Sequence, residues 1–346
     1  MADIAARLSP RAGLWRWRAH LAWLIQGVFA VGLVGILVVV VDRDELVRAV
    51  KRASPWWLAA TVVPTYLSEW MRAERWRFLM EPLARIPTGR LFGVLMVGLA
   101  ASSVLPLRAG DVFRMQYFGR RGLKRGAILA TLAAERLLDG LTFLIFVAVF
   151  AAFTLETSVL PLLAVAALAV ATAFWFTLQL EGIEPERVRG LRVLPRRLRE
   201  PARLQIVTFA SGLAPLRNRR LLLATLGTSL AAWGLAALVY AMVGKAVGLG
   251  LALPEYLAVV GVANLALAIP LTQAGLGAFE LSVTGFLVAL GASQGDAAAY
   301  SLLLHAVVVL PLVLGGIAAG MAMGVSYRDV FFLSGSDGTA ERGPES

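Results

Sequence analysis

The chain has 346 residues, of which 59% are hydrophobic and 16% charged, and its mean hydropathy is +0.75. This composition excludes a soluble globular protein and indicates an integral membrane protein. The net charge of +11 is assigned to cytoplasmic loops rather than to nucleic-acid binding, and the absence of cysteine excludes disulfides and thiolate metal sites.

Residues 1–20 are basic and precede an apolar run at residues 21–41. At about 1.5 Å per residue this run covers the roughly 30 Å hydrocarbon core, so we expect a retained transmembrane helix rather than a signal peptide. Residues 56–80 are predicted to form a second span. Its polar groups recur at three- and four-residue spacing on one face, at Thr61, Thr65, Glu69 and Arg72.

The next apolar run, residues 91–105, is basic on both sides. An arginine-rich stretch from Arg72 to Arg90, read as a loop, precedes it, and a second basic stretch follows to Arg125. Under the positive-inside rule both flanks are cytoplasmic, which one crossing helix cannot satisfy. We therefore predict a re-entrant hairpin with its turn at Pro106 to Gly110. Such a turn is tolerated at membrane depth only beside protein or water, so it should line a cavity.

Residues 127–153 are predicted to form a long span that carries three charged side chains, Glu135, Arg136 and Asp139. Residues 159–180 cross back without a charge. The arginine-rich residues 181–220 then form a cytoplasmic linker between two halves, in which residues 201–216 have the helical apolar spacing of a segment lying on the membrane surface.

The second half begins with an outward span at residues 221–247. Residues 256–290 are predicted to form a second re-entrant hairpin, entered from outside and split by Pro270, Gly275 and Gly277. Residues 300–325 return to the cytoplasm and are expected to be broken at Pro311. The polar tail, residues 326–346, is predicted to be disordered and cytoplasmic.

The two hairpins carry matching motifs, LPLRAGDVFR at residues 105–114 and IPLTQAGLGAFE at residues 269–280. Matching glycines also precede and follow them, which indicates an internal duplication. We therefore predict an all-α polytopic membrane protein of six full spans and two hairpins, with repeats at about residues 56–180 and 221–325 inserted in opposite directions. If the hairpins crossed fully, the count would be eight and the halves parallel.

The charges inside the predicted spans are the candidate site. A charge at the membrane centre costs about 2.5 to 3.5 kcal/mol, so it needs a partner, water or a ligand. Arg108, at the first turn, is the candidate phosphate ligand because its fork binds paired oxygens. The other candidate substrate ligands are Asp111, Arg114, Glu135, Arg136, Asp139, Asn264, Gln273 and Glu280.

Structural alternatives stand beside each of these assignments. Glu135 and Asp139 share one helix face and could instead pair with Glu69 or Arg72, and Arg108 could pair with Asp111. Glu69, Arg72 and His305 are candidates for either coupling or structural roles. His305 has no second histidine nearby, so a metal site is not expected, and no nucleotide-binding or hydrolase motif occurs. We expect neither a cofactor nor enzymatic activity.

The motif LPLRAGDVFR, the following GLKRGAILATLAAERLLDGL and the later IPLTQAGLGAFE resemble the lysylphosphatidylglycerol synthase transmembrane-region family, also called flippase-like proteins. The resemblance covers about residues 20–325. It implies a role in moving an aminoacylated phospholipid between leaflets. Two-domain members add a soluble aminoacyl-transfer domain, for which this chain shows no counterpart, so aminoacyl transfer is not expected. Stand-alone relatives imply hopanoid or polyprenol-linked lipids as alternatives.

Together these observations predict a lipid flippase or scramblase in the cell inner membrane, with both termini cytoplasmic and membrane lipids as partners. A non-transporting accessory subunit of lipid biosynthesis is the alternative. A scaffold needs its buried charges only to be paired, whereas a transporter needs a cavity that opens to one leaflet at a time.

Overall fold

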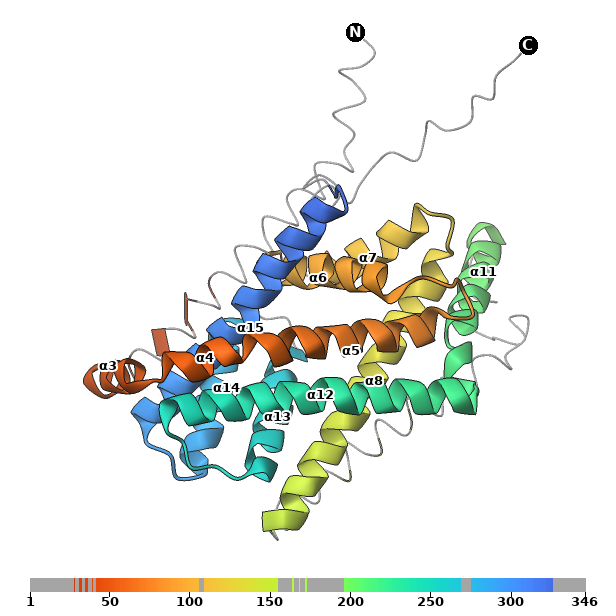
Figure 1. Cartoon of the computed structure of the whole chain (residues 1–346). Coiled ribbons are helices and arrows are strands. Elements are labelled where there is room, and N and C mark those ends of the chain that lie inside the picture. Colours follow the sequence, from red (N-terminus) through yellow and green to blue (C-terminus); the bar gives the residue numbers. More distant parts are fainter. Residues whose placement is uncertain are drawn as a thin grey trace.

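The structure is a computed structural model that describes residues 42–105, 109–154, 196–268 and 275–325, with isolated positions at 28, 31, 32, 35, 36, 39, 164, 168 and 172. Within these residues every regular element is helical, which confirms the predicted all-α membrane protein (Figure 1). Three of the described helices, α8, α12 and α15, are long and apolar enough to cross a membrane. The predicted spans at residues 21–41 and 159–180 lie largely outside the described residues.

The first half begins with a short helix, α3 (Arg43–Arg52), which Asp42 caps by accepting from the N–H groups of Asp44 and Glu45. Helices α4 (Pro55–Ala60) and α5 (Val62–Met80) then follow each other almost without interruption. The predicted first hairpin is built from α6 (Thr88–Val104) and α7 (Ala109–Gly119). Helix α8 (Arg125–Thr154) closes this half.

The second half repeats this order. Helix α11 (Arg196–Gly212) and the short 3-10 helix η3 (Ala214–Arg217) lead into α12 (Arg219–Val247), which Asn218 caps. The predicted second hairpin consists of α13 (Leu253–Ala268) and α14 (Ala278–Ala289). Helix α15 (Gln294–Ala322) ends the described chain.

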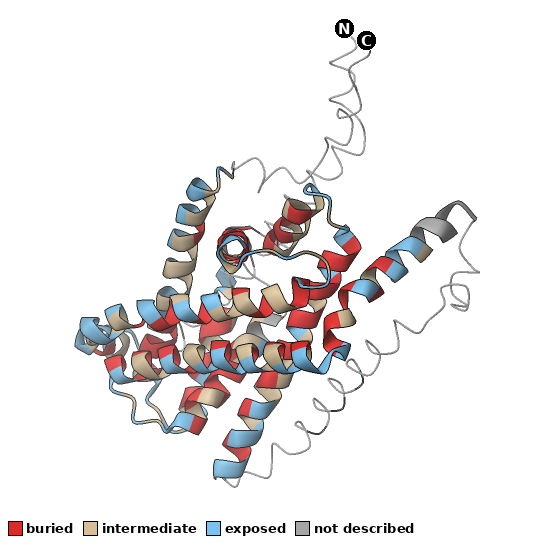
Figure 2. Ribbon diagram, turned by 45° about the vertical axis from the view of Figure 1, so that its right-hand side comes forward, coloured by how far each residue is buried: buried red, intermediate tan, exposed pale blue. Residues whose placement is uncertain are grey.

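The helices of the two halves interleave, so that the halves do not form separate units. Helix α5 lies along α12, as Figure 1 shows, α6 packs on α15, and α8 packs on α13. Each of these contacts joins a helix of one half to a helix of the other. In the last two, the first arm of a hairpin, α6 or α13, packs on the last long helix of the other half, α15 or α8. Buried residues lie on the sides of the helices that face other helices, and exposed residues lie on the outer sides (Figure 2).

Contacts between distant residues define two ends of the bundle. At one end the Ser54 N–H donates to the Ala246 carbonyl at 2.9 Å, and Arg52 pairs with Asp296 at 3.0 Å. At the other end Thr88 donates to Glu74 at 2.7 Å, and η3 packs on α5. Connectivity places both ends of the α6–α7 hairpin with the second group and both ends of the α13–α14 hairpin with the first.

Two expectations from the sequence are wrong in detail. The predicted span at residues 56–80 ends at Met80, as α5 does, so counting Arg72 to Met80 also with the following loop is wrong; Arg75 on these last turns is buried, with 2% of its surface exposed. Helix α15 is not broken at Pro311, because the described helix continues through it and through Gly315 and Gly316. Proline is tolerated in membrane helices, and the Tyr66 hydroxyl holds α15 to α5 at this point by donating to the Pro311 carbonyl at 2.9 Å.

Candidate functional site

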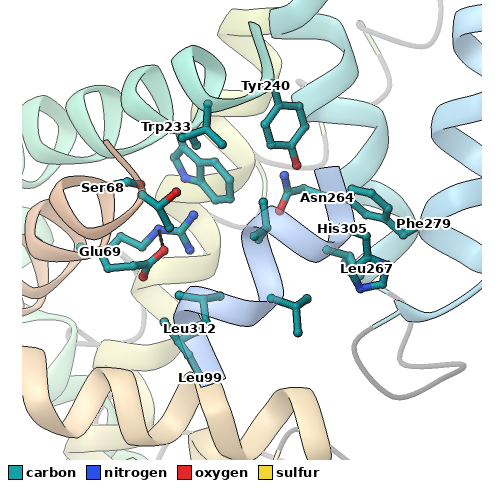
Figure 3. A pocket seen from close by; sticks show the side chains of 16 residues that line it. Ser68, Glu69, Leu99, Trp233, Tyr240, Asn264, Leu267, Phe279, His305 and Leu312 are labelled. Carbon is teal, nitrogen blue, oxygen red and sulfur yellow. Dashed lines mark ion pairs between the residues drawn. The ribbon is translucent and has the colours of Figure 1, made fainter. Parts of the chain in front are cut away.

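A cavity of about 190 Å³ lies where the two halves meet. Its wall is formed by α5, α12 and α15 together with residues of α6, α13 and α14 (Figure 3). Most of the lining is apolar, and the polar exceptions are Thr65, Ser68, Glu69, Arg72, Tyr240, Asn264 and His305. Four of these residues, Glu69, Arg72, Asn264 and His305, are candidates from the sequence, so one space contains candidates from both halves.

The α5 wall of the cavity carries an incompletely satisfied ion pair. Glu69 and Arg72 lie 3.5 Å apart, and the Arg72 guanidinium stacks over the Trp233 ring at 4.1 Å from its centroid. Glu69 is 5% exposed, and in the described part of the chain no hydrogen-bond donor reaches its Oε2 atom. A buried carboxylate oxygen without a donor is costly, so this oxygen is available to a donor from a ligand.

Asp139 on α8 is the centre of a buried polar cluster behind Trp233. Its Oδ1 accepts from Arg75 at 2.6 Å and from the Trp233 indole N–H at 2.7 Å. Arg75 also donates to Ser229 at 2.8 Å, which ties α5, α8 and α12 together. Asp139 therefore pairs with Arg75 and not with Arg72 as considered from the sequence.

Arg136 is the exposed member of the charged network. It lies 3.5 Å from Asp139 and 3.5 Å from Asp111 on α7, and half of its side-chain surface is exposed. Asp111 is itself 27% exposed. This arrangement presents a guanidinium beside a carboxylate at the bundle surface, and both are connected through Asp139 and Trp233 to the cavity wall.

Arg114 and Glu135 form a closed pair between α7 and α8. Two hydrogen bonds of 2.9 Å join the guanidinium to both carboxylate oxygens, and the Arg114 side chain stacks over the Trp76 ring at 3.8 Å. Both residues are 3% exposed. Because each charge is neutralised by the other, this pair is not an open ligand site, and the partner of Glu135 is Arg114 rather than Glu69 or Arg72, which the structural alternative named.

Glu280 and His305 form the corresponding pair in the second half, between α14 and α15. The His305 imidazole Nδ1 is hydrogen-bonded to Glu280 Oε1, and Glu280 Oε2 accepts from the Gly277 N–H at 2.6 Å. Gly277 has a φ of +83°, a conformation that favours glycine at this turn. Glu280 is a candidate substrate ligand from the sequence, and in the structure its side chain pairs with His305.

Several candidates lie elsewhere. Arg108, Pro106, Pro270 and Gln273 are outside the described residues. Gly110 is described and lies against α6, where its N–H donates to Ser102 at 3.1 Å. Asn264 lines the cavity and donates to the Val260 carbonyl at 2.8 Å. Gly275 has a φ of +77° and lies with Gly277 in the turn before α14.

Sequence reasoning missed three important residues, Arg75, Trp76 and Trp233. Arg75 was hidden by the neighbouring arginines, although Leu79 and Met80 continue the apolar helical pattern beyond it. Nothing in the sequence pattern indicates that the two tryptophans contact arginine side chains. Each provides both an aromatic face for a guanidinium and an indole donor, since Trp76 donates to Thr131 at 3.1 Å.

Comparison with known proteins gives two findings. The family model described as "Lysylphosphatidylglycerol synthase TM region" matches residues 23–316. The chain is also 26% identical over 358 aligned residues to a glycosyltransferase, AglD, of Haloferax volcanii. That alignment covers 92% of this chain and 57% of the relative, so the chain spans little more than half of the relative's length.

Proposed function

The chain belongs to the lysylphosphatidylglycerol synthase transmembrane-region family, and we propose that it moves a membrane lipid with a charged headgroup between the leaflets of the cell membrane. The observation that carries this proposal is Arg136. It lies eleven residues after Arg125, which begins α8 at the basic end of the bundle. At 1.5 Å per residue this is about 16 Å, roughly half of the hydrocarbon core.

A half-exposed guanidinium at this depth cannot face lipid tails at acceptable cost. Asp111 and Asp139 already neutralise its charge at 3.5 Å, but the exposed half of the guanidinium still needs water or a further acceptor, and a phosphate fits its fork. Glu69 Oε2, unpaired at the cavity wall, could accept from a hydroxyl or amine of the same headgroup. We propose that the headgroup phosphate binds first at Arg136 and then moves toward the cavity between the halves.

The arrangement of the hairpins supports this proposal. The second arms α7 and α14 have 11 and 12 residues, or about 16 and 18 Å, which is too short to cross the core. Each hairpin begins and ends at one end of the bundle, and the two hairpins use opposite ends. We therefore propose two inverted repeats with re-entrant hairpins. In secondary transporters the substrate site lies between such repeats.

The proposal is tested by reconstituting the pure protein in vesicles that contain fluorescent phosphatidylglycerol. The rate at which the label becomes accessible to an external quencher reports movement between leaflets. Loss of one member of a desolvated charged pair costs about 2 to 5 kcal/mol of binding, so Arg136→Ala should slow movement at least tenfold at limiting lipid. Arg136→Lys should restore it in part.

Arg48→Ala is the matched control, because Arg48 is exposed on α3, outside the charged network. It should change the rate by less than twofold. In Arg136→Ala, Asp139 still accepts hydrogen bonds from Arg75 and Trp233, so this variant should fold. Movement no faster than in protein-free vesicles would contradict transport of this lipid, and an unchanged rate in Arg136→Ala would contradict the assignment of Arg136.

The similarity to AglD favours one second candidate. Because that relative is called a glycosyltransferase and is longer than this chain, the shared part could serve a pathway of lipid-linked glycosyl transfer. In that case the chain would be an accessory membrane subunit beside a separate lipid-modifying enzyme. We assign no bond-making step to the residues described here. Fluorescent polyprenyl phosphate in the same vesicle assay distinguishes the two lipid classes.

A further inference from the structure

The Glu280–His305 pair holds together three parts of the second half. Glu280 lies in the first turn of α14, and His305 lies on α15 and lines the cavity. One Glu280 oxygen contacts the imidazole, and the other accepts the Gly277 N–H. Glu280 and His305 are 3% and 8% exposed. A change at His305 is therefore transmitted through a single carboxylate to the turn that starts α14.

The equivalent pair of the first half differs in one chemical respect. Arg114 and Glu135 also connect the second hairpin arm to the next long helix, and Phe113 and Phe279, directly before Arg114 and Glu280, are both buried. A guanidinium keeps its proton in proteins, whereas an imidazole gains and loses one near physiological pH. Between corresponding elements, one half has an arginine–glutamate pair with a permanent cation, and the other has a histidine–glutamate pair that offers a site for one proton.

Among the residues that the structure describes, the surroundings of the imidazole supply no charge without a counter-charge. Across the cavity, α5 presents Glu69 and Arg72, which pair with each other. Helices α12 and α13 present Tyr240 and Asn264, α6 presents Leu99, and the Phe279 ring of α14 lies 4.9 Å from the imidazole. On α3, Glu45 contacts α15 near its first turn, at Gly295.

The charge of the pair therefore depends on one proton. With neutral His305 and ionised Glu280 the pair carries one negative charge inside the membrane bundle. When a proton binds, imidazolium and carboxylate cancel. The free energy of an uncompensated charge depends on whether water reaches it, so binding of this proton is linked to the packing around the pair.

We propose that the Glu280–His305 pair is a proton-binding site whose occupancy is coupled to the position of α14, and through it to lipid movement. A proton from cavity water binds His305 Nε2, while the Nδ1–H group keeps donating its hydrogen bond to Glu280. Its release to water after α14 has shifted completes the cycle, and no other bond changes. The lipid step rests on the proposed function, whereas the proton site does not.

The absence of cysteine makes a direct test possible. Leu276 is 45% exposed in the turn between Gly275 and Gly277, so Leu276→Cys places one reporter thiol there. Its alkylation rate by a maleimide is measured from pH 5 to 8 in the full-length protein, with and without His305→Gln. Ionisation of the thiol affects both proteins equally, so the ratio of the two rates isolates the contribution of His305.

The ratio should change at least threefold along a one-proton curve, with slower alkylation at low pH, where the ion pair holds the turn. A ratio that stays constant with pH would overturn the proposal. The matched control is Ser301→Ala, which removes the buried 3.0 Å hydrogen bond between Thr284 and Ser301. That bond joins the same two helices one turn away and cannot titrate. Ser301→Ala should keep the pH dependence, and its loss there would assign the effect to packing and overturn the proton site.

Vesicles with fluorescent phosphatidylglycerol and an imposed pH gradient test the coupling. Lipid movement should change at least threefold with the direction of the gradient and lose this dependence in His305→Gln. If the rate of lipid movement does not depend on the pH gradient, the coupling is overturned and the proposed function remains intact. Alkylation that titrates in a protein that moves no lipid supports the proton site and overturns the proposed function.

Discussion

At the scale of single residues, the bundle encloses a charged network that is balanced among the described residues. Its guanidinium groups belong to Arg72, Arg75, Arg114 and Arg136, and its carboxylates to Glu69, Asp111, Glu135 and Asp139. Four charges of each sign cancel, which makes burial tolerable. Removal of a fully buried member, such as Arg75 or Glu135, would leave its partner as a buried, uncompensated charge, and such losses typically cost about 3 to 5 kcal/mol.

Arg75→Ala is therefore expected to lower the free energy of unfolding by about 3 to 5 kcal/mol, because Asp139 loses its 2.6 Å partner. Thermal unfolding in detergent measures the effect. The control is Arg77→Ala on the same helix. Arg77 is 36% exposed in its pair with Glu74, so its loss should cost about 1 kcal/mol or less. Asp139→Asn should partly rescue Arg75→Ala. Equal melting of the two arginine variants would contradict the role of Arg75.

The sequence predicted the charged residues better than their partners. Glu135 and Asp139 were found because a carboxylate within an apolar span is conspicuous. Their partners Arg114 and Arg75 could not be assigned, because the contacts depend on how α7 and α5 approach α8. Spacing along one helix predicts neighbours on that helix, such as Arg136 and Asp139, but not the geometry between helices.

At the scale of elements, the first hairpin depends on a close backbone approach between its arms. A Cβ atom at Gly110 on α7 would meet the Gly98 carbonyl oxygen and the Ser102 hydroxyl of α6. The sequence predicted a break between Pro106 and Gly110, since proline and glycine interrupt helices. It did not predict this approach, which requires glycine at position 110.

Gly110→Ala should destabilise the protein by about 1 to 3 kcal/mol, because the added methyl group forces α7 away from α6. Gly89→Ala on α6 is the control, since nothing lies within 4 Å of the added Cβ atom there. It should be neutral or slightly stabilising. Differential scanning fluorimetry compares the two variants, and equal melting temperatures would show that the arms tolerate separation at this point.

At the scale of the whole molecule, the two ends of the bundle have different charges. The end with Arg90 and Arg121 is strongly basic, whereas the end with Lys51 and Asp296 mixes signs. The positive-inside rule therefore predicts that the basic end faces the cytoplasm. The sequence already predicted this orientation. The structure adds that residues far apart in sequence, such as Arg52 and Asp296, lie at the same end.

Single cysteines at these exposed positions should report the orientation in intact cells. Lys51→Cys should react with an impermeant maleimide, whereas Arg90→Cys and Arg121→Cys should react only after the membrane is permeabilised. Arg90 and Arg121 flank the first hairpin. Reaction of these two cysteines from opposite sides would mean that the segment crosses the membrane, and the inverted-repeat proposal would fail.

The exchange of partners between the halves also has a consequence for biosynthesis. Helix α6 packs on α15, which ends roughly 220 residues later. At about 5 to 20 residues per second, α6 waits roughly 10 to 40 s after synthesis before its partner is complete. During that interval the charged groups of the first half lack the second half that encloses them. In the ribosome-bound intermediate these charged groups must therefore be kept from lipid. We expect this stage of biosynthesis to depend most on membrane insertion factors.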